Sequence, residues 1–159
     1  MIFRERTSKE LQPTGNVVEK SKCESGFTIS TGKCSPSNGA NNSPSLNLQF
    51  SPDSAYIAVV SADYPTCVWI FNLSDLMIVA VLQQINPVRS LAWHDTNPIL
   101  TVITSDASTL FVWQPSGCLC IPQPAVPDAR HLTWMTRKDT LLIFGGSSFS
   151  LAVPDWVTY

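Results

Sequence analysis

The sequence predicts an all-β protein, because a block of about 41 to 44 residues occurs three times between Leu46 and Tyr159. Each copy passes through the same order of strand and turn signals. An aromatic residue that closes the first strand recurs at Phe50, Trp93 and Trp134, in steps of 43 and 41 residues. A repeat of about 40 to 45 residues with four strand-like segments indicates a WD-type β-propeller blade. We therefore expect a partial propeller of three consecutive four-stranded blades, the last one incomplete.

The three predicted blades cover about residues 46–84, 88–122 and 130–159. In the first, alternating apolar residues predict a strand over 46–50, and strands over 56–60, 66–73 and 77–83 follow after tight turns. The second blade repeats this order over 88–93, 98–104, 108–114 and 118–121. The third predicts strands over 130–134, 140–144 and 149–153, and its fourth strand would have to come from 156–159. The three prolines of 121–129 predict a stiff extended connection.

Residues 1–45 form a different segment, which we predict to be disordered or a long loop. They contain all four Glu, six of the ten basic residues and no sustained apolar period. Such a segment buries too little apolar surface to offset its ordering entropy. Its Ser35-Pro36 and Ser43-Pro44 pairs match proline-directed phosphorylation sites, but ordinary loop composition explains them better.

Certain repeat positions are predicted to be structural positions of the blades rather than ligand-binding sites. Four tryptophans could be imagined as a ligand cage, but their register on strands favours packing between blades. The turn before the third strand carries Asp in blades one and two and Gly146 in blade three. The predicted structural positions are Phe50, Asp63, Phe71, Trp93, Asp106, Trp113, Trp134 and Val153.

No catalytic, cofactor or metal site is predicted. Cys118 and Cys120 have only one residue between them, and ten separate Cys23 from Cys34, spacings that structural zinc sites do not favour. Five cysteines in a chain without a signal-peptide core indicate free thiols in a reducing compartment. His94 follows a predicted strand and His131 lies near the start of one, so a role in turn formation is favoured over catalysis. Gly145-Gly146 lacks the lysine of a phosphate-binding loop. A propeller hydrolase or lyase is the disfavoured alternative.

Nucleic acid and membrane are not predicted partners. Residues 46–159 carry eight Asp against four Arg and Lys, so this part has no basic face. The longest strongly apolar run, 76–82, is far shorter than the roughly 20 residues of a membrane-spanning helix. Three blades are fewer than the four to eight or so of a closed propeller, so we expect partner blades upstream in a longer chain.

Several segments of the repeat resemble one family in particular. The stretches FSPDS, VWIFNL, VAVLQQINPVRSLAW and LFVWQPSGC are similar to the C-terminal blades of a WD-repeat family of centrosomes and spindle poles, whose vertebrate member is encoded antisense to a tumour-suppressor gene. The likeness covers about residues 46–159. The Trp-Asp dipeptide of standard blades is replaced by Phe71-Asn72, Trp113-Gln114 and Val153-Pro154.

The resemblance implies a non-catalytic protein-interaction scaffold. It implies a location in the cytoplasm and cytoskeleton, at the centrosome or spindle pole, and a coiled-coil centrosomal adaptor as partner. Members help to anchor microtubule minus ends and to support spindle and cilium assembly. The alternative is a WD-type assembly or substrate-recognition subunit of another complex, in RNA processing or ubiquitin transfer.

Overall fold

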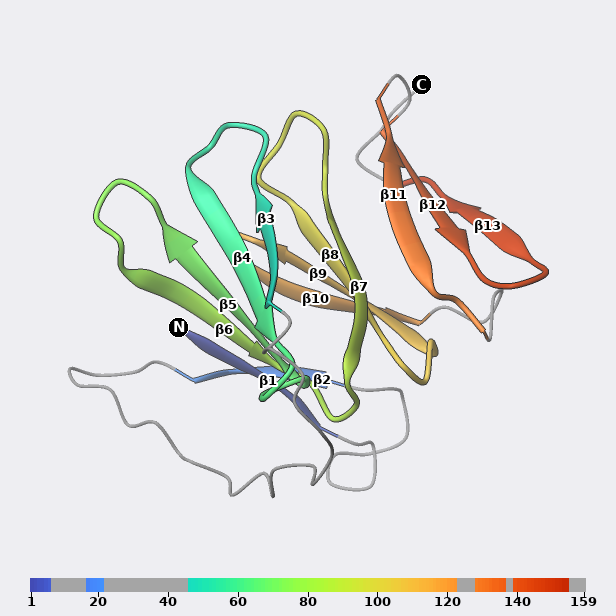
Figure 1. Cartoon of the computed structure of the whole chain (residues 1–159), viewed down its shortest axis with the longest axis horizontal. Coiled ribbons are helices and arrows are strands. Elements are labelled where there is room, and N and C mark those ends of the chain that lie inside the picture. The colour runs from blue at the N-terminus through green and yellow to red at the C-terminus, as the bar shows by residue number, and fades with distance from the viewer. Residues whose placement is uncertain (7–16, 22–45, 123–127, 137–138, 155–159) are drawn as a thin grey trace.

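The computed structural model describes residues 1–6, 17–21, 46–122, 128–136 and 139–154. Their regular structure consists of strands in three sheets, which stand side by side as successive blades with β3, β7 and β11 adjacent along one side (Figure 1). Among these residues, none belongs to a helix long and apolar enough to cross a membrane. The predicted all-β architecture of propeller blades is confirmed.

Blade one contains β3 (Leu46–Phe50), β4 (Tyr56–Ser61), β5 (Cys67–Asn72) and β6 (Ile78–Gln83) as an antiparallel meander. The first turn forms as its residues predict. The Asp53 carboxylate accepts the Ala55 amide at 3.1 Å, and the Ser51 hydroxyl accepts the Tyr56 amide at 2.9 Å. These two bonds satisfy backbone groups that have no ladder partner, so the chain reverses sharply between β3 and β4.

Blade two contains β7 (Val88–Trp93), β8 (Leu100–Thr104), β9 (Thr109–Gln114) and β10 (Gly117–Pro122). All five residues of β8 and the first five of β9 are buried. Both faces of β8 and β9 are buried because blade two lies between the sheets of blades one and three (Figure 1). A strand covered on both faces reads as a continuous apolar run, as TLFVW does.

Blade three contains β11 (His131–Met135), β12 (Thr140–Phe144) and β13 (Phe149–Ala152), three antiparallel strands. They reproduce the first three predicted strands to within two residues at each end. The fourth predicted strand, at 156–159, lies outside the described residues, as does most of the proline-rich connection.

The N-terminal segment differs in part from the prediction of disorder. β1 (Ile2–Arg6) pairs in parallel with β6 at the outer edge of blade one, and β2 (Val17–Ser21) pairs antiparallel with β1, so this sheet has six strands. Met1 fixes the start of the pairing, because its amino group donates to the Val79 carbonyl at 2.9 Å. β1 joins the sheet because the chain begins with a short apolar stretch, which places the buried Phe3 in the core of blade one. Ser35, Ser43, Cys23 and Cys34 lie outside the described residues.

The cores of the protein lie between the blades. We call the face of each sheet that carries Leu48, Leu91 or Leu132 its front face and the opposite one its back face. The back face of blade one, with Ala58 and Ile70, packs on the front face of blade two. The back face of blade two packs in the same way on the front face of blade three, so each junction joins a back face to the next front face.

Candidate interaction surface

Of the four tryptophans predicted to pack between blades, Trp93, Trp113 and Trp134 do so, whereas Trp69 lies on the front face of blade one, edge-on to Tyr64 with ring centroids 5.8 Å apart. Trp93 is 9 % exposed, and its indole nitrogen donates to the Gln49 carbonyl of blade one at 3.0 Å. Trp113 lies edge-on to Trp93 and to Tyr56 of blade one, with ring centroids 6.0 and 5.5 Å apart. Edge-to-face pairs of this kind add about 0.5 to 1.5 kcal/mol beyond the burial of their area. The junction of blades one and two is therefore an aromatic core, and the ligand-cage alternative has no support there.

Strand register corrects one predicted structural position. Leu100 pairs with Trp113 in blade two, and its repeat equivalent Leu141 pairs with Ala152 in blade three. Ala152 packs against the second core, whereas Val153 follows the end of β13 and is 43 % exposed. The assignment of Val153 was wrong by one residue, and because side chains alternate between the faces of a strand, that shift moves the side chain to the other face.

In blade two the turn aspartate, Asp106, accepts hydrogen bonds within its turn. The Asp106 carboxylate accepts the hydroxyl groups of Thr104 at 2.7 Å and Ser108 at 2.9 Å. Partial burial raises the pKa of Asp106, but these hydrogen bonds outweigh it and hold the pKa below its ordinary value. Asp63 is exposed in the corresponding turn of blade one, where its amide donates to the Ser61 hydroxyl at 3.2 Å.

Blade three obtains the missing turn carboxylate from another segment. Asp128, which precedes β11, accepts the Gly146 amide at 2.9 Å and the Ser148 hydroxyl at 3.4 Å. The Gly146 amide, more than any other group, lowers the pKa of Asp128. A Cβ atom at Gly145 would lie 2.7 Å from the Asp128 Cγ and 2.8 Å from its carbonyl oxygen, so this turn requires glycine there. The repeat alignment missed Asp128 because it stands 18 residues before Gly146 in sequence.

His94 orders a turn, as predicted. Its ring is 2 % exposed, and Nδ1 accepts the amides of Thr96 at 3.1 Å and Asn97 at 3.2 Å, so Nδ1 carries no proton. Nε2 lies 3.1 Å from Asp139 Oδ1 of blade three, and the ring centroid is 4.5 Å from that of Trp134. The buried imidazole therefore packs the β7–β8 turn against Trp134 of the next blade.

The other predicted reactive groups are separated. His131 lies on the back face of blade three, with its ring centroid 5.3 Å from that of Phe144. Cys118 and Cys120 pack against the first core as small apolar side chains. Burial and the neighbouring Cys120 raise the pKa of Cys118 to about 12, so its thiol is not nucleophilic at neutral pH. Within the part of the chain that the structure describes, no group of three or more His, Cys, Asp or Glu side chains is placed to hold a metal ion.

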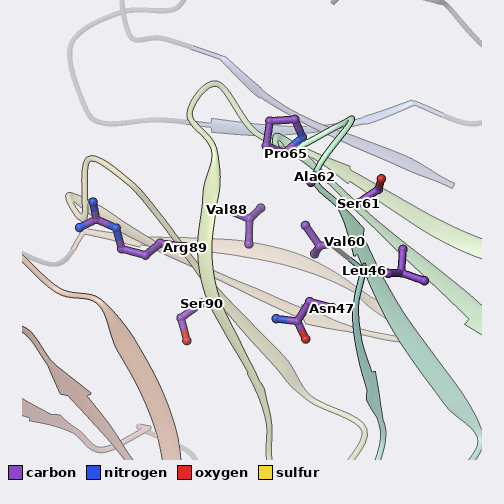
Figure 2. A pocket seen from close by; sticks show the side chains of 9 residues that line it. All are labelled: Leu46, Asn47, Val60, Ser61, Ala62, Pro65, Val88, Arg89 and Ser90. Atoms are coloured by element: carbon purple, nitrogen blue, oxygen red, sulfur yellow. The ribbon is translucent and has the colours of Figure 1, made fainter. Parts of the chain in front are cut away.

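A cavity of about 240 Å³ opens between the first two blades (Figure 2). This is smaller than the roughly 300 to 1,000 Å³ of small-molecule sites. The Arg89 side chain points away from the other lining residues in Figure 2, and its Nη1 donates to the Ala129 carbonyl at 3.3 Å. The cavity therefore lacks a converging charged group. Its walls are formed by Leu46, Asn47, Val60, Ser61, Ala62, Pro65, Val88, Arg89 and Ser90.

The two outermost blade faces each expose large apolar side chains. On the front face of blade one, Leu48 is 48 % and Phe50 is 60 % exposed. On the back face of blade three, Phe149 is 71 % and Leu151 is 54 % exposed. Contiguous apolar faces of this kind mark interaction surfaces in soluble proteins. These two faces, together with the turns along the blade ends, form the candidate interaction surface.

Comparison with known proteins finds sequence similarity to WD-repeat proteins. The chain is 32 % identical over 106 residues to the mouse (Mus musculus) WD repeat-containing protein WRAP73. This match covers 65 % of this chain and 23 % of the relative. The chain is 29 % identical over 76 residues to an uncharacterised WD repeat-containing protein of Schizosaccharomyces pombe, covering 42 % of this chain and 16 % of the relative. The matched part thus spans less than a quarter of either relative. A search against protein-family models gave no match.

Solved structures show the same fold. A chain in the crystal structure of the mitotic checkpoint complex matches this one with a TM-score of 0.52 at 14 % identity, over 69 % of this chain and 38 % of that chain. The neighbour is a WD40 propeller, and at this identity the likeness speaks for the fold alone. In its repeat and its sheets the chain is thus similar to WD-repeat proteins, in sequence over part of their length and in the propeller-blade fold.

Proposed function

We propose that the chain is a non-catalytic protein-interaction scaffold of microtubule-organising centres, at the centrosome or spindle pole. The observation that carries the scaffold role is the distribution of apolar surface. Aromatic and aliphatic side chains fill both junctions between blades, and a further apolar face remains exposed at each end. Such a framework presents rigid edges and turns to partners and needs no reactive group.

The location is supported by sequence resemblance. The segments FSPDS, VWIFNL, VAVLQQINPVRSLAW and LFVWQPSGC resemble the centrosomal and spindle-pole WD-repeat family, and the relative WRAP73 matches over 106 residues. On this proposal the partner is a coiled-coil centrosomal adaptor. The chain would help that adaptor to anchor microtubule minus ends and to support spindle and cilium assembly.

Imaging of the tagged chain in dividing animal cells tests the proposal. We expect a signal at the spindle poles that persists after brief depolymerisation of microtubules, and recovery of a coiled-coil centrosomal protein after cross-linking and purification. A matched control carries Ile70→Asp, which places a charge in the fully buried junction of blades one and two and should abolish both results.

Two outcomes would contradict the proposal. A signal confined to the nucleus, with RNA-processing proteins recovered, would favour an assembly subunit in that pathway. Recovery of ubiquitin-transfer components, with no imaging signal at the spindle poles, would favour a substrate-recognition subunit. Either outcome would leave the blade fold intact, because the fold rests on separate observations.

A further inference from the structure

The β5–β6 turn of blade one carries the most exposed large apolar side chain of the described residues. Leu76 is 73 % exposed, and its neighbour Met77 is 54 % exposed. Leu76 also has a positive φ of 57°, a left-handed conformation that crowds a side chain with a Cβ atom and that glycine or asparagine usually adopts. The turn therefore holds an apolar side chain in water at a conformational cost.

Blade two shows that the architecture of a blade does not require such a turn. Its equivalent turn, between β9 and β10, consists of the exposed residues Pro115 and Ser116, and strand pairing resumes at Gly117. Neither Pro115 nor Ser116 has a positive φ. A two-residue connection thus closes the same corner of a blade without an exposed large apolar side chain. Backbone strain that the fold does not need points to a function for the turn.

Hydrogen bonds within the β5–β6 turn hold its exposed side chains on a fixed framework. The Asn72 side-chain oxygen accepts the Ser74 amide at 2.8 Å, and the Asp75 carboxylate accepts the Met77 amide at 3.0 Å. Because these amides have partners inside the turn, another molecule would contact the side chains and not these backbone groups. A turn that is already ordered also loses little conformational entropy when it binds.

A second turn adds negative charge beside this apolar pair. The β3–β4 turn lies at the same edge of blade one (Figure 1), and the Leu73 amide donates to its Ala55 carbonyl at 2.8 Å. Asp53 in this turn and Asp75 in the β5–β6 turn are both exposed, and neither turn contains Lys or Arg. Carboxylates repel nucleic-acid phosphates and anionic lipid headgroups, so this edge favours a cationic protein segment.

We propose that this edge binds an amphipathic helix of a partner protein, with lysine or arginine residues beside the apolar stripe of the helix. Leu76 and Met77 contact the stripe, and Asp53 and Asp75 pair with the flanking cations. A helix suits this surface because its own backbone groups are satisfied internally, whereas a partner strand would need unpaired backbone groups to bond with. The inference names a partner class for the proposed scaffold, so it rests on the scaffold role but not on the spindle-pole location.

Site-specific photo-cross-linking of the tagged full chain in dividing animal cells identifies the segment that contacts the turn. The photoreactive residue p-benzoylphenylalanine replaces Leu76 in one variant and Leu119 in a matched control. Leu119 is also exposed, at 53 %, but lies on β10 of blade two. We expect position 76 to give a cross-linked partner peptide with an apolar period of about 3.6 residues and Lys or Arg beside its stripe. Position 119 should not give that peptide.

The affinity of the identified segment, made as a labelled synthetic peptide, then measures the role of each side chain. Leu76→Gly should weaken binding by about 30-fold or more, the effect of losing a central anchor. Glycine adopts a φ of 57° without strain, so this variant should unfold at the urea concentration of the wild type or higher. Asp75→Asn keeps an oxygen for the Met77 amide but removes the charge, so it should weaken binding and reduce its salt dependence. Leu119→Ser is the control and should leave the affinity unchanged.

Three results would overturn the proposal. The first is no more cross-linking from position 76 than from position 119. The second is a product that contains lipid, nucleic acid, or a peptide that is acidic or lacks the helical apolar period. The third is a folded Leu76→Gly variant that binds the peptide as the wild type does. The proposed location fails separately, because a chain absent from the spindle poles could still give the cross-link, and a chain at the poles could fail to give it.

Discussion

Leu91 and Leu48 allow a matched test of the idea that the junctions between blades stabilise the fold. They occupy equivalent positions in blades two and one, but Leu91 is 3 % exposed and Leu48 is 48 % exposed. Truncation of a buried leucine to alanine costs about 2 to 5 kcal/mol, of which part comes from the cavity left behind. We expect Leu91→Ala to cost about 3 kcal/mol. Leu48→Ala removes half-exposed atoms and encloses no cavity, so it should cost about 1 kcal/mol or less.

The assay is urea unfolding followed by tryptophan fluorescence and circular dichroism. Each substitution is introduced separately into the wild-type chain. Equal slopes with urea would show that the two variants unfold the same amount of surface. If the losses of unfolding free energy for Leu91→Ala and Leu48→Ala agree within about 0.5 kcal/mol, the reasoning is refuted, because additivity errors between independent sites are of that size. That result would mean that the front face of blade one is covered in solution.

The remaining predictions concern single turns and one thiol. Gly145→Ala should lower the melting temperature by several degrees, because its Cβ would meet Asp128, whereas Gly117→Ala, with no atom within 4 Å, should change it little. Asp106→Asn should lower the free energy of unfolding at pH 7. In the wild type, the lowered pKa of Asp106 stabilises the fold above the ordinary value of 3.8, and this stabilisation is lost as the pH falls; the variant should lack that pH dependence. Unfolding measured at several pH values tests this. Cys118, with a pKa of about 12, should react with iodoacetamide at pH 8 far more slowly in the native chain than in urea, as mass spectrometry of its peptide can show. The same raised pKa should make stability fall as pH rises above the ordinary value of 9.0.

Much of each blade could be predicted from the sequence because its determinants are local. Alternating apolar residues and Ser-Pro-Asp-Ser turn chemistry set the strands of blade one, and a repeated period fixed the order of blades two and three. The packing role of Trp93 and Trp113 also followed, because residues in register on successive sheets meet at the same junction. The fourth strand of blade three remains a prediction, since 156–159 lie outside the described residues.

Other features could not be predicted, because they depend on contacts between distant segments. β1 joins blade one by pairing with β6, which lies over 70 residues away, and β2 joins by pairing with β1; no local period marks such an edge. Asp128 replaces a turn carboxylate from 18 residues upstream, and Asp139 reaches His94 from the next blade. Ala152, not Val153, faces the core, because a slip of one residue in a strand changes the face without changing the repeat.

The sequence by itself determined the kind of repeating unit, the blade, and the number of its copies in this sequence, because strand period, turn chemistry and repeat length are properties of a continuous stretch of chain. The tertiary structure decided which copies of one repeated position are buried. Leu48 and Leu91 have the same type and the same place in their blades, yet only Leu91 is covered, since burial depends on the neighbouring sheet and not on the strand. That difference locates the apolar front face of blade one, which the described part of the chain leaves exposed.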